Sequence, residues 1–145
     1  MQNNLRNELS DRLVTEITNL YHKVYLGMLD FRQGPIDELP QLKTLMLLAD
    51  KGPLRVGQIA ENTESTPSAM TATLHRLVDR NLVTRERYPQ DRRVVICELT
   101  STGRTVLNGI KHAIRERVLA ATDTWSMEQF EAVVKALESM HPHHL

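Results

Sequence analysis

Six arginines lie between positions 76 and 93 of this 145-residue chain, and no lysine lies among them. A planar guanidinium can bind a phosphate or a guanine edge through two parallel hydrogen bonds, which the point charge of a lysine cannot do. The composition of this segment therefore indicates an anion-recognising surface, and the alternative is a solvated face with scattered ion pairs. The six residues are Arg76, Arg80, Arg85, Arg87, Arg92 and Arg93.

The overall charge hides this concentration. The chain carries 18 basic and 18 acidic side chains, so its formal net charge is zero. Residues 51–104 carry 9 basic and 6 acidic side chains, whereas residues 1–50 carry 5 and 7, and residues 105–145 carry 4 and 5. Neutrality therefore does not exclude a nucleic-acid partner, because the positive charge is gathered in the middle of the chain.

Composition excludes several classes of protein. The single cysteine, Cys97, cannot close an internal disulfide, and no apolar run approaches the roughly 20 residues of a membrane span. The first residues lack the apolar stretch of a secretion signal. We find no Gly-rich phosphate loop, nucleophile elbow or paired zinc-ligand motif. The sequence predicts a cytoplasmic protein that is not an enzyme and needs no cofactor or metal.

Apolar periodicity predicts long helices at both ends of the chain. A stripe with steps of three or four residues runs from Leu5 to Phe31, and Gly34-Pro35 ends it. A second such stripe follows Thr100, and a last helix begins at Ser126 with a capping box to Gln129. The last helix is expected to bury Phe130, Val133, Val134, Leu137 and Met140. The first of these helices would be about 40 Å long, which is too long for a small domain to cover. Part of its apolar stripe should therefore pack on another chain.

Shorter elements lie between these helices. A helix is expected from Asp37 or Leu39 to Gly52, with Leu42, Leu45, Met46, Leu48 and Ala49 on its buried face. Residues 54–80 are predicted to form two short helices, and Thr66 caps the second. The second helix should bury Met70, Leu74, Leu77 and Val78, which leaves a face of small and polar side chains. Residues 82–87 and 92–99 alternate as the two strands of a hairpin.

A helix–turn–helix followed by a hairpin is a winged helix-turn-helix unit. Its second helix fits a major groove, and its hairpin can reach phosphates or the adjacent minor groove. The predicted fold class is therefore mainly α with a small β-hairpin wing. We expect an N-terminal dimerisation helix at 1–36, a DNA-binding unit at 37–100 and C-terminal dimerisation helices at 101–145.

From Leu54 to Gly103 the chain resembles the MarR family of bacterial and archaeal transcription regulators. The resemblance rests on an Asp-x-Arg wing tip at residues 91–93, followed in register by Leu-Thr-x-x-Gly at 99–103. Residues 74–83 match the family's passage from recognition helix to wing, with Asn81 where glycine is common. One departure is Arg55, because the family often places a capping Ser or Thr there. The sequence therefore offers no Ser or Thr capping box at the start of that helix, and Arg55 is a candidate for a phosphate contact.

The resemblance implies an obligate homodimer that binds double-stranded DNA at a palindromic operator. It also implies a repressor that releases DNA on binding a small aromatic ligand between the dimer helices and the winged unit. An alternative from another class is a winged-helix module for protein interaction, with no specific DNA target. Salt-sensitive duplex binding would separate the two.

Individual side chains then receive expected roles. Asp91 should orient an arginine rather than touch DNA, because a carboxylate beside a phosphate repels it. For Arg85 and Arg87, internal pairing with Glu86 or Asp91 is the alternative to a phosphate contact. The predicted DNA-binding residues are Arg55, Ser65, Thr66, Ser68, Ala69, Thr71, Ala72, His75, Arg76, Arg85, Arg87, Asp91, Arg92 and Arg93.

Other reactive side chains receive weaker roles. Ligand binding is assigned to Tyr21, His22 and Tyr25, with a place in the dimer interface as the alternative for His22. Cys97 alternates with core positions, so it is expected to be a buried hydrophobe rather than a redox sensor. His112 lies four residues before Glu116, but no third metal ligand is evident.

Overall fold

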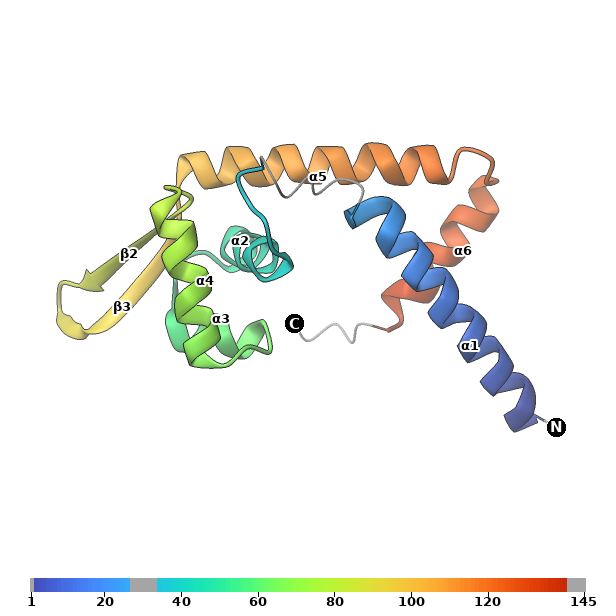
Figure 1. Ribbon diagram of the computed structural model, residues 1–145, viewed down its shortest axis with the longest axis horizontal. Helices are drawn as coiled ribbons and strands as arrows, with labels where there is room; N and C mark the ends of the chain where they lie inside the picture. Colours follow the sequence, from blue (N-terminus) through green and yellow to red (C-terminus); the bar gives the residue numbers. More distant parts are fainter. Residues whose placement is uncertain (1, 27–33, 141–145) are drawn as a thin grey trace.

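The structure is a computed structural model that describes residues 2–26 and 34–140 (Figure 1). A π-helical turn, His22–Leu26, follows the first helix. The remaining elements are α1 (Gln2–Tyr21), α2 (Leu39–Lys51), β1 (Leu54–Arg55), α3 (Val56–Asn62), α4 (Pro67–Asp79), β2 (Val83–Tyr88), β3 (Asp91–Leu99), α5 (Ser101–Ala121) and α6 (Met127–Glu138).

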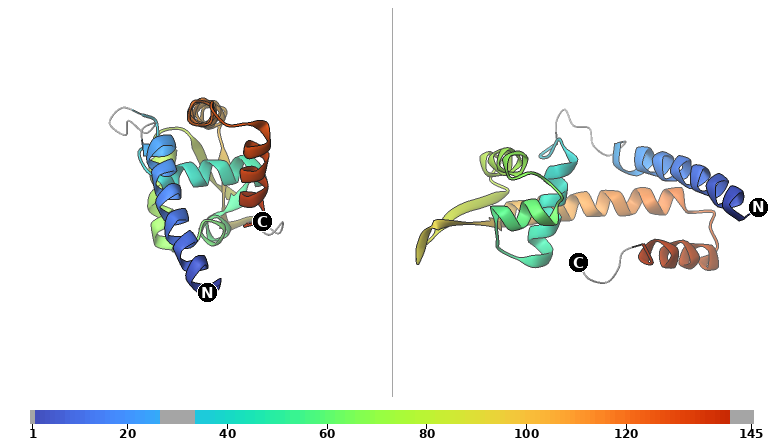
Figure 2. Two further views of the ribbon diagram at one scale, coloured as in Figure 1. Left: turned by 90° about the vertical axis from the view of Figure 1, so that its right-hand side faces the viewer. Right: turned by 90° about the horizontal axis from the view of Figure 1, so that it is seen from below.

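These elements form two ends joined by α5. Helices α2, α3 and α4 and the hairpin β2–β3 gather at one end, while α1 and α6 lie at the other (Figures 1 and 2). The long α5 runs between the two ends. This arrangement confirms the predicted fold class, a mainly helical chain with a hairpin wing and helices on both sides of the winged unit.

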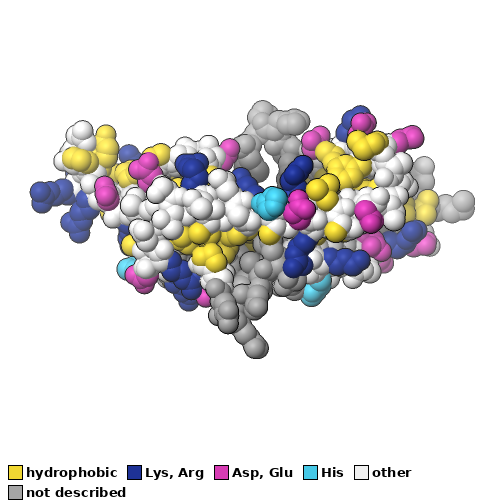
Figure 3. Space-filling view, turned by 90° about the horizontal axis from the view of Figure 1, so that it is seen from above, with side chains coloured by type: hydrophobic (Ala, Val, Ile, Leu, Met, Phe, Trp, Pro, Cys, Tyr) yellow, Lys and Arg dark blue, Asp and Glu magenta, His cyan; other side chains and the backbone are white. Residues whose placement is uncertain are grey.

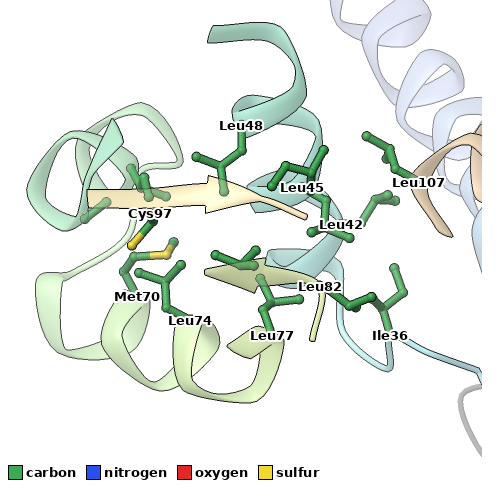
Figure 4. Close-up of a cluster of buried hydrophobic side chains, with 14 residues drawn as sticks. Ile36, Leu42, Leu45, Leu48, Met70, Leu74, Leu77, Leu82, Cys97 and Leu107 are labelled. Carbon is green, nitrogen blue, oxygen red and sulfur yellow. The ribbon is translucent and has the colours of Figure 1, made fainter. Parts of the chain in front are cut away.

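The buried core belongs almost wholly to the winged unit. Leu45 of α2, Ile59 of α3, Leu74 of α4 and Cys97 of β3 are fully buried together, as Figure 4 illustrates for part of the cluster. Leu107 joins them from the first turns of α5. The hydrophobic effect therefore fixes the three helices, the wing base and the start of α5 relative to one another.

The wing is part of a three-stranded antiparallel sheet with the order β1-β3-β2. Strand β1 is only two residues long, and it pairs Leu54 with Cys97 and Arg55 with Ile96. We predicted helix from residue 54, so this strand is a correction. Two residues are too few for a period-two pattern to appear in the sequence.

The predicted helix starts are confirmed at three positions. The hydroxyls of Thr66, Thr100 and Ser126 accept hydrogen bonds from backbone N–H groups three residues later, at 3.1, 2.8 and 3.1 Å. Each bond satisfies one of the otherwise unpaired donors at a helix start. The rings of Trp125 and Phe130 meet edge to face across the start of α6, in the arrangement known as a hydrophobic staple.

The Leu-Thr-x-x-Gly segment joins the wing to α5. A Cβ at Gly103 would overlap the carbonyl oxygen of Leu82, so only glycine fits this approach. The same carbonyl accepts from the N–H of Thr100, and the Thr100 hydroxyl donates to the carbonyl of Asn81 at 2.7 Å. Asn81 itself has φ 57°, a left-handed conformation that asparagine tolerates better than most residues. This geometry explains the motif physically.

The terminal helices differ from their predictions in burial. Within the single chain that is described, α1 and α6 bury no side chain, and the stripe from Leu5 to Leu20 is exposed. The predicted buried face of α6 is likewise exposed at Val133, Val134, Leu137 and Met140, while Phe130 is half-buried. The first α-helix ends at Tyr21, and the part of its predicted stripe at Met28 and Phe31 lies outside the described residues. No helix among the described residues is both long enough and apolar enough to span a bilayer.

Two other predicted core residues are exposed. Met46 is 44% exposed and Val78 is 36% exposed. Each follows a fully buried leucine, Leu45 or Leu77, so a helical turn of about 100° per residue carries it past the edge of the buried face.

Candidate nucleic-acid interface

One face of α4 is exposed and carries short side chains. Ser68, Ala69, Ala72 and His75 are exposed and recur at steps of one, three and three residues, which places them on one side of the helix. The opposite side buries Met70, Thr73, Leu74 and Leu77. An exposed helix face without bulky side chains allows close approach of its backbone to a flat or grooved partner. This face matches the one predicted for α4.

The wing has two faces of different charge. Register pairs Val83 with Leu99, Arg85 with Cys97 and Arg87 with Val95, and directly paired residues share a face. At the wing base this face packs into the core through Val83, Cys97 and Leu99. Farther out it carries Arg85, which therefore lies on the side of the wing that faces α3 and α4.

Three arginines from separate elements line one hollow beside α3. Arg55 comes from the residue before α3, Arg85 from β2 and Arg93 from β3, and the hollow measures about 380 Å³. No carboxylate lines it. Space-filling Figure 3 shows basic side chains at the wing tip, on the left, and others along the rest of this face. Like charges that converge in this way attract an anion, since they otherwise repel one another.

The opposite face of the hairpin is acidic and apolar. A second hollow, of about 350 Å³, is lined there by residues that include Glu86, Glu98, Ile96 and Tyr88. Arg87 also lines this second hollow, although its pairing with Val95 puts it on the same face as Arg85, and it is not among the residues that line the arginine hollow. Glu86 and Glu98 thus lie on the face opposite Arg85, which a sum of charges over the sequence does not reveal.

The wing tip holds one arginine in place. Asp91 Oδ1 accepts from the backbone N–H of Arg93 at 3.0 Å and from its Nε at 3.2 Å. The Arg93 side chain is nevertheless 92% exposed. Orientation of an arginine by Asp91 is therefore confirmed as a contact. Within the described residues no salt bridge joins Arg85 or Arg87 to Glu86 or Asp91, which were the predicted alternatives.

The remaining predicted residues surround these features. Arg92 is exposed next to Arg93, and Ser65 is half-buried in the turn before α4. Thr71 is half-buried, and its hydroxyl donates to the carbonyl of Pro67 at 2.9 Å. The Arg55 side chain makes no cap bond, but its backbone N–H donates to Gln58 Oε1 at 2.9 Å, which secures the start of α3 from the other side.

Sequence reasoning missed a polar network at the other end of α4. Arg76 Nη1 lies 2.6 Å from Glu38 Oε1, and Arg80 binds Asp37 through both of its terminal nitrogens, at 3.3 and 3.1 Å. The signal in the sequence was a pair of arginines four residues apart and a pair of adjacent acids. These pairs are separated by about 40 residues, so periodicity could not join them.

The other candidate sites have less structural support. Cys97 is fully buried, and burial raises the pKa of its thiol although Arg85 lies opposite, which supports the predicted core role. Among the described residues no cluster of three metal-ligating side chains occurs, so His112 and Glu116 have no third ligand there. The rings of Tyr21 and His22 meet edge to face at 6.2 Å, while the side chain of Tyr25 lies outside the described part.

The fold and the site together define a winged helix-turn-helix protein with a basic wing face. The MarR family profile matches residues 38–95. The HTH-type transcriptional regulator YfiV of Bacillus subtilis (strain 168) is 32% identical over 99 residues, which cover 68% of this chain and 62% of YfiV. The HTH-type transcriptional repressor MdtR of the same organism is 35% identical over 98 residues, which cover 65% of this chain and 63% of MdtR.

The chain thus spans a little over three fifths of the length of these two relatives. A MarR family protein from Bacillus stearothermophilus superposes with a TM-score of 0.82, covering 97% of this chain and 96% of that one, at 23% identity. That likeness shows the shared fold. The chain belongs, through its winged helix-turn-helix unit, to the MarR family of transcriptional regulators.

Proposed function

We propose that the chain is a sequence-specific DNA-binding transcriptional repressor. The observation that carries this proposal is the hollow of Arg55, Arg85 and Arg93 beside α3, which accompanies an exposed face of short side chains on α4. The relative MdtR is a transcriptional repressor by name, which supports repression rather than activation. We assign base contacts to the α4 face around Ala72 and His75, and phosphate contacts to Ser65, Thr66 and Ser68.

The hollow formed by Arg55, Arg85 and Arg93 suits one backbone phosphate. Its three cations come from three elements that the core fixes in place, so binding requires little reordering of the backbone. Arg92, exposed at the wing tip, is assigned to the minor groove, where a narrow A·T-rich groove attracts arginine. Arg87 is assigned a phosphate contact at the edge of the wing.

We further propose that the chain acts as a homodimer on a palindromic operator. The exposed apolar stripes of α1 and α6 support this, because a second copy would bury both. Two symmetric recognition helices would then reach half-sites about one helical turn apart. A small aromatic effector is assigned to Tyr21, His22 and Tyr25, near the boundary between the terminal helix and the winged unit.

The first experiment measures duplex binding by wild type, Arg92→Ala and Arg93→Ala, using sites selected by the chain from random DNA. We expect each substitution to weaken binding by about tenfold, and wild-type affinity to fall steeply with salt. The control is Arg115→Ala, which removes the same charge from an exposed position in the middle of α5. It should leave affinity within about twofold.

Retention of wild-type affinity in both wing variants would overturn the assignment of the wing arginines. If wild type shows no salt-sensitive duplex binding at all, the protein-interaction module becomes the better interpretation. Circular dichroism of each variant separates a lost contact from a lost fold.

A further inference from the structure

One arginine of α4, the helix assigned to DNA contact, already forms an ion pair in the free chain. Arg76 lies on α4 one residue after His75, and its guanidinium is paired with the Glu38 carboxylate at 2.6 Å. Both side chains remain roughly half exposed, at 49% and 44%. The pair therefore lies at the surface, where solvent or another anion can reach the guanidinium.

The backbone that carries Glu38 is held in place by the network around it, and its carbonyl accepts from the backbone N–H of Gln41 at 3.2 Å. Glu38 is the residue before α2, and Gln41, three residues later, is fully buried. Gln41 donates to Asp37 at 2.7 Å and accepts from the Asp37 backbone N–H at 3.1 Å. Arg80 adds a hydrogen bond to the carbonyl of Pro35 at 3.0 Å.

The Asp37 carboxyl shows the electrostatic effect of this network. The Arg80 guanidinium beside it holds the pKa of Asp37 below its ordinary value. Glu38 is therefore flanked by a fixed charge pair and a fixed helix start, and it presents its carboxylate to Arg76 from the α2 side. The pairing holds the guanidinium of Arg76 against the residue that precedes α2.

We propose that Glu38 competes with DNA for Arg76. In the free chain the Glu38 carboxylate pairs with the Arg76 guanidinium. When DNA binds, a phosphate or a guanine edge replaces the carboxylate. This inference rests on the proposed DNA-binding function. Exposed ion pairs contribute about 0–1 kcal/mol, so DNA can displace the carboxylate. The free energy needed to break the pair weakens DNA binding by the same amount. Glu38 thus sets the affinity of α4 for DNA without touching DNA itself.

The alternative to competition is that Glu38 orients Arg76 for its contact with DNA. The two roles predict opposite signs when the charge is removed. Competition predicts that Glu38→Gln binds DNA about two- to fivefold more tightly, which is the exposed pair's contribution converted to affinity. Orientation predicts weaker binding.

The experiment is a double-mutant cycle on the selected duplex, with wild type, Glu38→Gln, Arg76→Ala and the double variant at one low salt concentration. We expect the gain from Glu38→Gln to vanish in the Arg76→Ala background, because nothing then remains to be released. The matched control is Glu64→Gln, which removes an exposed carboxylate in the turn before α4 that forms none of the salt bridges in the described residues. Its effect should be smaller and should persist in the Arg76→Ala background.

Three results would overturn competition at Arg76. They are weaker or unchanged binding by Glu38→Gln, an equal gain with and without Arg76, and an Arg76-dependent gain of the same size for Glu64→Gln. Absence of salt-sensitive binding by wild type would overturn the proposed function as well, so the two failures are distinguishable. Thermal unfolding of all variants without DNA shows whether the fold survives each change.

Discussion

The winged unit and the terminal helices differ in how their apolar side chains are covered. In the winged unit, α2, α3, α4 and the hairpin cover one another, and leucines such as Leu45 and Leu74 are fully buried. In α1, leucines of equal size and similar spacing are about half exposed, for example Leu9 and Leu13. The two regions differ in whether one chain provides the partner surface.

This difference indicates which part of the chain can fold alone. The π-helical turn after α1 does attach to α5, because Val24 is buried and Arg117 donates to the carbonyl of Lys23 at 3.2 Å. Beyond that attachment, the stripe of α1 lies in the open. In the proposed homodimer, a second copy covers these exposed apolar stripes. The stability of the winged unit should therefore be independent of protein concentration, and that of the terminal helices should not be.

The largest effect is expected from a cavity in the winged core. Leu45→Ala removes a fully buried side chain from α2, where it packs with α4 and the wing base. Such a truncation should lower the free energy of unfolding by about 2–5 kcal/mol, through lost transfer energy and an unfilled cavity. Denaturant titration at several protein concentrations measures it.

The matched control is Met46→Ala on the neighbouring, exposed position of α2. It should lower the free energy of unfolding by less than about 1 kcal/mol. If Leu45→Ala became much less destabilising at high protein concentration, the winged unit would also depend on a second copy, and the contrast between the two regions would fail.

The next effect tests the other region. Leu13→Glu places a charge in the exposed stripe of α1, and we expect it to convert a dimer into a monomer, because burial of an unpaired carboxylate at an apolar interface is strongly unfavourable. Sedimentation velocity measures the change. Circular dichroism should show the winged unit still folded, since it shares no buried contact with Leu13.

Thr15→Glu provides the control for this change. Thr15 is exposed on the other side of α1, about 200° around the helix from Leu13. The variant should remain dimeric. A wild-type protein that sediments as a monomer, or a Leu13→Glu protein that stays dimeric, would remove the stripe as the basis of assembly.

Local signals allowed most of the winged unit to be predicted from the sequence. Helix starts at Thr66, Thr100 and Ser126 depend on residues within four positions, so the sequence contains the whole interaction. The wing's register follows from a period of two, which put Cys97 into the core correctly. The family resemblance supplied the order of elements and was confirmed by the match to residues 38–95.

Contacts between distant segments could not be predicted in the same way. The ion pair between Glu38 and Arg76 joins α2 to α4, and β1 exists only because Leu54 and Arg55 pair with β3. The exposure of Val78 depends on where the buried face of α4 ends, which its neighbours in space decide. The DNA contacts themselves stay predictions, since they involve a second molecule.

The smallest effect separates the two regions by their helix caps. Thr66 and Ser126 each accept one backbone hydrogen bond, both at 3.1 Å, at the starts of α4 and α6. Replacement of either hydroxyl residue by alanine should lower helix stability by about 1 kcal/mol. For Thr66→Ala this loss should appear in the unfolding of the winged unit and be the same at every protein concentration.

For Ser126→Ala the loss should appear where α6 is held by a second copy. The dissociation constant of the dimer should rise by about thirtyfold, because each of the two copies loses about 1 kcal/mol, while unfolding of the winged unit is unchanged. Sedimentation equilibrium measures the first quantity, and denaturant titration at low concentration measures the second. If both caps changed the same transition by the same amount, α6 would be stabilised by its own chain rather than by a partner. The exposed apolar side chains of α6 would then be covered by something other than a second copy.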